Sequence, residues 1–379
     1  MITIRKVDNP RDYRAFFNFP WTLYRNDPNW VPPLLSSRRE ILEAKHNPAW
    51  EYLEGDYFCA WRGDELVGTV AAFVNKRHNE FHGEQVGWFG AFETINDEGV
   101  AHSLINTAAD WVRAKGLPIL RGPQTLTTHE LVGCLVDGFI PPALLMPYNP
   151  PYYPHLIESA GLQKVTDMYS FYLDQDEARA NGLYDRLARI SQSIMKRNKI
   201  TVEVADPKNL KAAFANIKEI YNTAWDKNWG FVPLTPRELD AIVDGLGMVV
   251  DARMLYFGYV EGQLAGFILA VPDLNMAIKH AYPRPGEWEL FTLLKVLWHW
   301  KVRSKIDTVR VPLMGVKAEH RSRGVDAVLY SHILQAITNC GYHKSDSGWI
   351  LEKNETMVSI AQNFGSRIYK THRLYEKAV

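Results

Sequence analysis

A basic, glycine-containing turn between an expected strand and an expected helix is the part of this 379-residue sequence best suited to chemistry. Residues 309–328 read VRVPLMGVKAEHRSRGVDAV, an apolar run followed by a polar turn and an amphipathic segment. The first N–H groups of a helix have no intrahelical partner and carry the positive end of its dipole, so they bind phosphate. Gly324 allows close backbone approach, and Arg321 and Arg323 add positive charge. We therefore predict an anion-binding site at this turn.

The turn resembles the acetyl-CoA pyrophosphate loop of the GNAT (Gcn5-related N-acetyltransferase) superfamily. That loop follows the pattern (Gln/Arg)-x-x-Gly-x-(Gly/Ala), and Arg321 and Gly324 fill its first two fixed places, whereas Asp326 replaces the small residue. The resemblance implies that the preceding strand splays at a bulge and offers backbone groups to the pantetheine arm, which maps onto Met314, Gly315 and Val316. It also implies acetyl-CoA or another acyl-CoA as co-substrate. The implied cofactor-binding residues are Met314, Gly315, Val316, Arg321, Ser322, Arg323, Gly324, Val325, Asp326 and Asn354.

A second motif lies downstream, where Asn354 begins the segment NETMVSIAQNFG. It resembles the GNAT motif in which an Asn opens a helix that packs under the cofactor. The general-acid Tyr of the family would fall at Ala361, so that route to protonating the CoA thiolate is missing, and Tyr369 and Tyr375 are the candidate substitutes. The strand before the turn also has no carboxylate, so a base must come from elsewhere in the chain or from water. Glu352 is the candidate, beside its plainer interpretation as a solvated strand-end residue. The candidate catalytic residues are Glu352, Asn354 and Tyr369.

The chain is a diverged tandem repeat. Residues 58–68 and 256–266 both read as a strand, a Gly-containing turn and a strand, which predicts a β-hairpin in each half. Further strands are expected at 85–93 and 308–316, each followed by an amphipathic helix that ends at a Gly. We predict an α/β (α+β) fold with two GNAT-like domains, each a mixed, mostly antiparallel sheet flanked by helices. The expected boundaries are 1–175, a linker helix at 176–199, and an acyl-CoA-binding domain at 200–379.

The N-terminal copy is expected to be degenerate. Equating its helix end with that of the C-terminal copy aligns Gly324 with Gly99 and replaces both arginines by the turn Asn96-Asp97-Glu98, which would repel phosphate. Instead, this half inserts the polar loop 121–142, which suits a scaffold or an acceptor-binding wall. The candidate substrate-binding residues are His129, Glu130, Tyr152 and Tyr153.

A helical insertion distinguishes the C-terminal copy. It covers residues 274–307 and contains WELFTLLKVLWHWKV. We interpret it as a packing or dimerisation helix rather than a catalytic element.

Composition narrows the partners and the compartment. Lys plus Arg and Asp plus Glu are both 43, so no net field draws the chain to nucleic acid or to a membrane. Three cysteines with no CxxC pair, and no apolar signal segment, favour a cytoplasmic protein. The His78/His82 spacing does not match a zinc-protease helix, so no metal is expected.

The leading hypothesis is therefore transfer of an acetyl or other acyl group from CoA to an amine of a small molecule or peptide. A tandem-GNAT aminoacyl or peptidyl transferase that does not use CoA is a second hypothesis, and a non-catalytic CoA-binding or sensing protein is a third. The sequence leaves the acceptor and the oligomeric state open.

Overall fold

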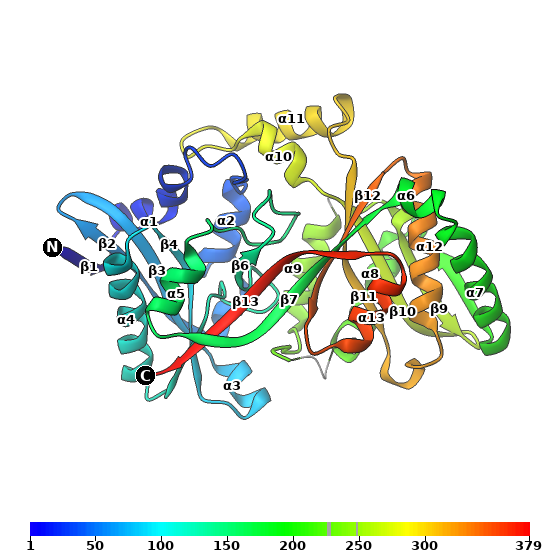
Figure 1. Ribbon diagram of the computed structural model, residues 1–379, viewed down its shortest axis with the longest axis horizontal. Coiled ribbons are helices and arrows are strands. Elements are labelled where there is room, and N and C mark those ends of the chain that lie inside the picture. The colour runs from blue at the N-terminus through cyan, green and yellow to red at the C-terminus, as the bar shows by residue number, and fades with distance from the viewer. Residues whose placement is uncertain (226–228, 248) are drawn as a thin grey trace. The chain divides into compact units, whose positions relative to one another are not determined.

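The computed structural model describes residues 1–225, 229–247 and 249–379, which form two compact units (Figure 1). Unit 1 comprises Met1–Met168, Asn275–Val302 and Lys370–Val379, and unit 2 comprises Tyr169–Leu274 and Arg303–Tyr369. Each unit combines helices with a mostly antiparallel sheet, so the predicted fold class is confirmed. The units differ from the expected continuous domains, because the insertion and the end of the chain belong to unit 1.

Unit 1 is built on five strands from the start of the chain, in the spatial order β1-β2-β3-β4-β5, with β13 beside β5. All these pairs are antiparallel except β4–β5. Its elements are β1 (Ile2–Lys6), α1 (Pro10–Leu23), α2 (Leu35–Leu42), η1 (Pro48–Glu51), β2 (Leu53–Arg62), β3 (Glu65–Asn75), α3 (Lys76–His82), β4 (Val86–Thr94), α4 (Glu98–Ala114), β5 (Ile119–Gly122), β6 (Cys134–Asp137), α5 (Tyr153–Ser159), α10 (Asn275–Ala281), α11 (Glu289–Leu297), η3 (Trp298–Val302) and most of β13 (Arg367–Ala378).

Helix α4 closes one face of the unit 1 sheet (Figure 1). Its apolar residues recur three and four apart, so they form one buried stripe. The helix ends as predicted, because Gly116 has a φ of 76° and provides the left-handed residue after the last turn. A second group of aromatic and aliphatic side chains from α1 and α2 packs around the buried Cys59.

Unit 2 repeats this arrangement in the order β8-β9-β10-β11-β12, with β7 beside β12. Its one parallel pair is β11–β12 among the pairs described. Its elements are most of β7 (Gln163–Asp174), α6 (Gln175–Ala180), α7 (Leu183–Asn198), β8 (Ile200–Val204), α8 (Leu210–Ala224), α9 (Pro236–Gly247), η2 (Ala252–Met254), β9 (Leu255–Val260), β10 (Gln263–Pro272), β11 (Thr308–Val316), η4 (Ala318–His320), α12 (Val325–Asn339), β12 (Lys344–Leu351) and α13 (Glu355–Asn363).

Helix α12 is the central helix of unit 2, and its predicted buried face is confirmed. Helix α7 lies beside it (Figure 1). Leu183 and Leu187 of α7 join the same core, so the helix expected to link two domains is an integral part of unit 2. The hairpins predicted at 58–68 and 256–266 are both present, and the second turns through Glu261 and Gly262 at positive φ.

The last strand explains why the units interleave in sequence. β13 pairs antiparallel with β5 over residues 375–378 and with β6 over 371–373. The segment 121–142, which the sequence indicated was a polar loop, is therefore partly strand: its start completes β5 and Cys134–Asp137 forms β6. Of the helices in the described parts of the chain, none combines the length and apolar character that crossing a membrane requires.

Candidate functional site

Strand β11 supplies the first part of the candidate site, because its pairing with β10 continues further along the strand than its pairing with β12. On one edge β11 pairs with β10 as far as Val316, opposite Gly266. On the other edge it pairs in parallel with β12 over residues 308–311. In the described chain, the backbone groups of residues 312–316 on the β12 edge therefore lie beyond that ladder. Such groups are available to a ligand.

A β-bulge lies at the point where β11 diverges. The register shifts between Leu269 and Val271 of β10, so residues 311–312 of β11 face one residue of β10. Pro312 explains why the bulge lies here, because a proline has no N–H to donate to the neighbouring strand. The sequence-based position of the bulge was three residues too late. It had been assigned to Met314, Gly315 and Val316.

Gly315 is required for packing rather than for a bulge. A Cβ at this position would lie 2.8 Å from the Cβ of Ala224, at the end of α8. Met314 and Val316 point to the other face and pack partly against the unit 2 core. All three residues keep their backbones in the β10 ladder.

The N-terminus of α12 forms the second part of the site. Gly324 is the N-cap residue at φ 80°, and it has no side chain that could bond to the first N–H groups of the helix. Ser322 also has a positive φ of 64°, which turns the loop sharply before the helix. The predicted strand–turn–helix is therefore present, with backbone N–H groups at an end that carries positive charge.

The charged side chains of this turn have three different surroundings. Arg321 donates from Nη2 to the backbone oxygens of Thr223 (3.3 Å) and Ala224 (2.9 Å), so it fastens the turn to the end of α8. Arg323 is exposed and is the cation best placed to meet an anion. The Asp326 carboxylate accepts a bond from the Ala327 N–H at 2.9 Å and so occupies one donor of the first turn.

The equivalent turn of unit 1 is closed by a carboxylate. Asp97 is the N-cap of α4, and its Oδ1 accepts from the Val100 N–H at 3.0 Å while Oδ2 accepts from Arg62 at 2.6 Å. By its place in the helix, Asp97 is the counterpart of Gly324, whereas the sequence alignment had chosen Gly99. The helix end was aligned correctly, but α4 is longer than α12 by two residues.

The three candidate catalytic residues all belong to unit 2. Glu352 directly follows β12 and is partly buried. Asn354 is the N-cap of α13, where its side chain accepts from the Met357 N–H at 3.3 Å. The Tyr369 hydroxyl donates to Asp346 Oδ2 at 2.6 Å, and burial together with that carboxylate raises the pKa of Tyr369 well above its usual range. Tyr375, the other substitute acid, belongs to unit 1 and bonds to Glu158.

Sequence reasoning missed a buried charge cluster at the base of the β11–β12 divergence. Arg310 and Asp346 face each other across the two strands, 4% and 1% exposed in their side chains, with Nε and Oδ1 3.8 Å apart. Arg310 also donates to the backbone oxygen of Gly348 at 2.9 Å. These contacts hold the strands together immediately before they separate. The signal in the sequence was a single charged residue, Arg310, in the otherwise uncharged β11, and an Asp inside β12.

The candidate substrate-binding residues fall into two places in unit 1. Glu130 accepts a bond from Asn47 Nδ2 at 2.6 Å, and the N–H of the partly buried His129 donates to Thr127 Oγ1 at 3.3 Å. Tyr152 and Tyr153 instead begin α5, where the Tyr152 hydroxyl donates to the Thr94 backbone oxygen at 2.9 Å. The pair His129 and Glu130 and the pair Tyr152 and Tyr153 are therefore held by separate sets of contacts within unit 1.

Tyr153 belongs to a second cluster that the sequence did not reveal. Its hydroxyl donates to Glu93 Oε2 at 2.9 Å, and Tyr24 donates to the same oxygen. Burial raises the pKa of Glu93 despite these donors and despite the nearby Arg38. β4 and β11 both span nine residues, which places Glu93 at the position of Gly315. The carboxylate missing from β11 is thus present in the equivalent strand of unit 1.

The divergence of β4 from β5 in unit 1 contains part of its own chain. Those strands pair over residues 86–88, after which the Gln124 N–H bonds to the Phe89 oxygen at 2.9 Å. A Cβ on Gly90 would lie 1.8 Å from the Gln124 oxygen. Unit 2 is therefore the better candidate for a ligand between diverging strands. Within residues 1–225, 229–247 and 249–379, no cluster of three or more His, Cys, Asp or Glu side chains is arranged to hold a metal.

Comparison with known proteins agrees with this geometry. No protein-family model matches the sequence. A solved tandem GNAT protein from the clavulanic acid biosynthesis pathway superposes with a TM-score of 0.55, over 100% of this chain and 98% of that one, at 11% identity. Two curated relatives match the whole sequence. Protein YghO of Escherichia coli is 32% identical over 99% of this chain and 95% of its own, and a bacterial ceramide synthase of Caulobacter vibrioides is 32% identical over 100% and 98%. The chain belongs to the family that contains these two relatives, and it has a tandem-GNAT fold.

Two structural features carry the likeness of this chain to the GNAT fold. One is the bulged strand that leaves its parallel neighbour, and the other is the turn that leads into the following helix. Both occur twice, but only unit 2 combines the divergence with a glycine N-cap among the described residues.

Proposed function

We propose that this tandem-GNAT protein is an acyl-CoA-dependent N-acyltransferase and that unit 2 binds the acyl-CoA. The observation that supports this most directly is the pairing of Gly324 at the N-terminus of α12 with the divergence of β11 from β12. The helix end suits the pyrophosphate, and the backbone groups of residues 312–316 suit the amide-bearing pantetheine arm.

The residues of the turn fit this ligand unevenly, which refines their proposed roles. Arg323 is exposed and supplies charge, whereas Arg321 holds the loop to α8 and acts as a positioning residue. Asp326 takes one N–H of the first turn, so the pyrophosphate would use the neighbouring donors. Removal of the Asp326 carboxylate should therefore strengthen CoA binding.

Acyl-CoA supplies a thioester whose carbonyl carbon is attacked by the lone pair of an amine. The C–N bond forms, the C–S bond breaks, and the proton lost by the amine balances the one gained by the CoA thiolate. Glu352, which follows β12, is the proposed base for the ammonium form of the acceptor. Tyr369 is bound to Asp346, so we assign it a positioning role in β13 rather than proton donation to the thiolate.

The proposed acceptor is an amine that carries a long alkyl chain. This rests on the relative named a ceramide synthase, since a ceramide is the amide of a fatty acid and a long-chain amino alcohol. The amine of a peptide or of another small molecule, as expected from the sequence, is the competing class.

The CoA site is tested with charge reversal at Arg323. Gly324→Val is unsuitable, because a Cβ at Gly324 would lie 2.8 Å from Ile194 Cγ2 and any loss of binding would be ambiguous. Arg323→Glu changes an exposed side chain, and Lys208→Glu makes the same charge change elsewhere in unit 2. We expect Arg323→Glu to weaken CoA binding by about ten-fold or more in calorimetry, and Lys208→Glu to change it less than about two-fold. Equal affinity of both variants would refute the site.

The reaction is tested by release of the CoA thiol. Acyl-CoA donors of increasing chain length are paired with sphinganine, glucosamine and a lysine peptide, and the amide is identified by mass spectrometry. We expect amine-dependent thiol release that is fastest with sphinganine and is lost in Glu352→Gln. Tight CoA binding without turnover on any amine would instead favour a sensing protein, and absence of CoA binding would favour a CoA-independent transferase.

A further inference from the structure

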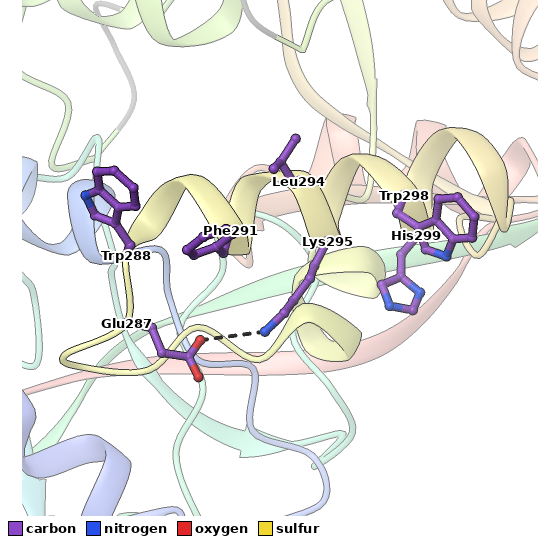
Figure 2. A pocket seen from close by; sticks show the side chains of 7 residues that line it. All are labelled: Glu287, Trp288, Phe291, Leu294, Lys295, Trp298 and His299. Atoms are coloured by element: carbon purple, nitrogen blue, oxygen red, sulfur yellow. Dashed lines mark ion pairs between the residues drawn. The ribbon is translucent and has the colours of Figure 1, made fainter.

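The helical insertion of unit 1 presents an unusually apolar surface to solvent. Trp288, Leu294 and Trp298 are 72%, 54% and 51% exposed. Figure 2 shows Trp288 and Leu294 projecting from one side of the helix and Lys295 and His299 from the other. Soluble proteins rarely expose contiguous apolar patches of this kind. The exposed apolar residues of α11, its preceding residue and η3 are Trp288, Leu290, Phe291, Leu293, Leu294, Leu297, Trp298 and Val302.

Only a narrow stripe of this helix faces its own unit. Thr292 and Val296, four residues apart, are its buried members. The remainder is apolar almost all round, a pattern found in helices that are surrounded by an apolar medium. The interpretation of the insertion as an ordinary packing helix is therefore not sufficient, because most of its apolar surface packs on nothing within unit 1.

The insertion is fastened to unit 1 so that this surface is held outward. The Glu289 carboxylate accepts bonds from the N–H and the hydroxyl of Ser36, both at 2.9 Å. Trp21 Nε1 donates to the Pro283 oxygen at 2.7 Å. His280 of α10 stacks on His299 of η3 with ring centroids 5.1 Å apart. Polar contacts thus anchor one side of the helix, and the apolar side is presented by a fixed scaffold.

The insertion carries a small excess of positive charge. Its unit 1 segment, Asn275–Val302, contains four basic residues, Lys279, Arg284, Lys295 and Lys301, against Glu287 and Glu289. Glu289 is bound by Ser36, and Glu287 lies 3.7 Å from Lys295. A local positive excess therefore accompanies the apolar surface in a chain with no net charge. This combination complements an anionic lipid surface.

The length of the helix determines how it can meet a bilayer. α11 and η3 run continuously from Glu289 to Val302. At ~1.5 Å per residue they extend roughly 20 Å, which is shorter than the ~30 Å hydrocarbon core. Such a helix lies in the plane of the interface. Three tryptophans, Trp288, Trp298 and Trp300, suit this depth because the indole ring is apolar while its N–H remains hydrated.

We propose that α11 and η3 form a membrane-surface anchor that inserts its apolar face into the headgroup boundary of an anionic bilayer. An open groove of about 510 Å³ follows the helix, lined by Trp288, Phe291, Leu294, Trp298 and the Glu287–Lys295 pair (Figure 2). The expectation of no membrane partner followed from the net charge of the whole chain, which gives no information about the charge and apolar character of one local surface. The anchor stands independently of the proposed transferase activity, because it is tested by binding alone.

The experiment is flotation of the full chain with vesicles of phosphatidylcholine, with or without phosphatidylglycerol. The variant Trp288→Ser/Leu294→Ser/Trp298→Ser removes three exposed side chains, and Phe81→Ser/Ile190→Ser removes exposed apolar side chains elsewhere as the control. We expect wild type and control to float with the anionic vesicles, and the triple variant to bind them roughly a hundred-fold more weakly. Thermal unfolding of all three proteins establishes that the fold is kept.

Each other outcome overturns the proposal. If wild type does not float with either vesicle, the insertion is not an anchor. Equal binding to both vesicle types would remove the role of anionic lipid. If wild type is a dimer that the triple variant dissociates, and neither protein binds vesicles, a second copy covers the face instead.

Discussion

Replacing Tyr369 by Phe separates a structural role of this residue from a catalytic one. The hydroxyl donates at 2.6 Å to Asp346, whose side chain is 1% exposed. A hydrogen bond to a charged group contributes about 1.5–3 kcal/mol, and loss of a buried donor costs a similar amount. Arg310 lies 3.8 Å from the other carboxylate oxygen and offsets part of the loss. We therefore expect Tyr369→Phe to lower the free energy of unfolding by about 2 kcal/mol.

The assay is urea unfolding of the full chain followed by circular dichroism at neutral pH, with thermal unfolding beside it. Unit 2 contains roughly 170 residues, so a loss of about 2 kcal/mol corresponds to a decrease of about 4–8 °C in Tm. The control is Tyr172→Phe, because the Tyr172 ring packs against Tyr369 in a tilted arrangement with centroids 5.8 Å apart. We expect that variant to remain within about 0.5 kcal/mol of wild type.

The second measurement is kcat per folded molecule, which distinguishes a positioning role of Tyr369 from a catalytic one. A positioning role for Tyr369 leaves kcat within a few-fold of wild type once the folded fraction is considered. If Tyr369→Phe abolished kcat while the unfolding curve stayed unchanged, the reasoning from the Asp346 bond would be refuted. Tyr369 would then be the general acid that the resemblance first indicated.

Three further predictions concern stability. Lowering the pH from about 6.5 to 4 should destabilise unit 1 by up to about 3 kcal/mol, because burial lowers the pKa of His78 to about 4 and the unfolded chain takes up the proton first. When the free energy of unfolding from urea titrations is plotted against pH, His78→Gln should show a weaker dependence on pH than wild type. An unchanged pH dependence would contradict this. Burial raises the pKa of Glu93, so the stability that its protonated form contributes is present at low pH and is lost as the pH rises. The free energy of unfolding of Glu93→Gln relative to wild type should therefore increase from pH 4 to pH 8. A decrease over this range would show that the hydrogen bonds to Glu93 outweigh its burial. Gly324→Ala should lower the free energy of unfolding by about 1–2 kcal/mol through the positive φ of residue 324, and by more through the contact of the new Cβ with Ile194. The same substitution in an Ile194→Ala background should therefore destabilise the protein less, as measured by calorimetry. Equal destabilisation in both backgrounds would exclude the contact.

The regular elements of both units could be predicted because their signals are local. The strand expected at 308–316 has those bounds in the structure, and α12 buries the face that its three-and-four spacing indicated. The glycines at 116 and 341 end their helices at positive φ, as a residue without a Cβ allows. Each of these features depends on residues within one or two turns of chain.

The details of the candidate site depended on contacts that the sequence did not indicate. Pro312, not Gly315, marks the bulge, because the missing N–H matters more there than the missing side chain. Arg321 could be read as a phosphate ligand until its bonds to Thr223 and Ala224 were visible. Helix ends are also poor alignment anchors, and so Asp97 rather than Gly99 is the counterpart of Gly324.

By itself the sequence determined that this chain is a tandem repeat of two α/β units and where the second unit could bind an anion. These properties come from hydrophobic periodicity and from short motifs, which act between neighbours in the chain. Only the tertiary structure decided that β13 completes unit 1, that Arg310 faces Asp346, and that α11 turns its apolar side outward. Such outcomes depend on which distant segments pair and pack, and the same apolar helix satisfies its local pattern whether protein or lipid covers it.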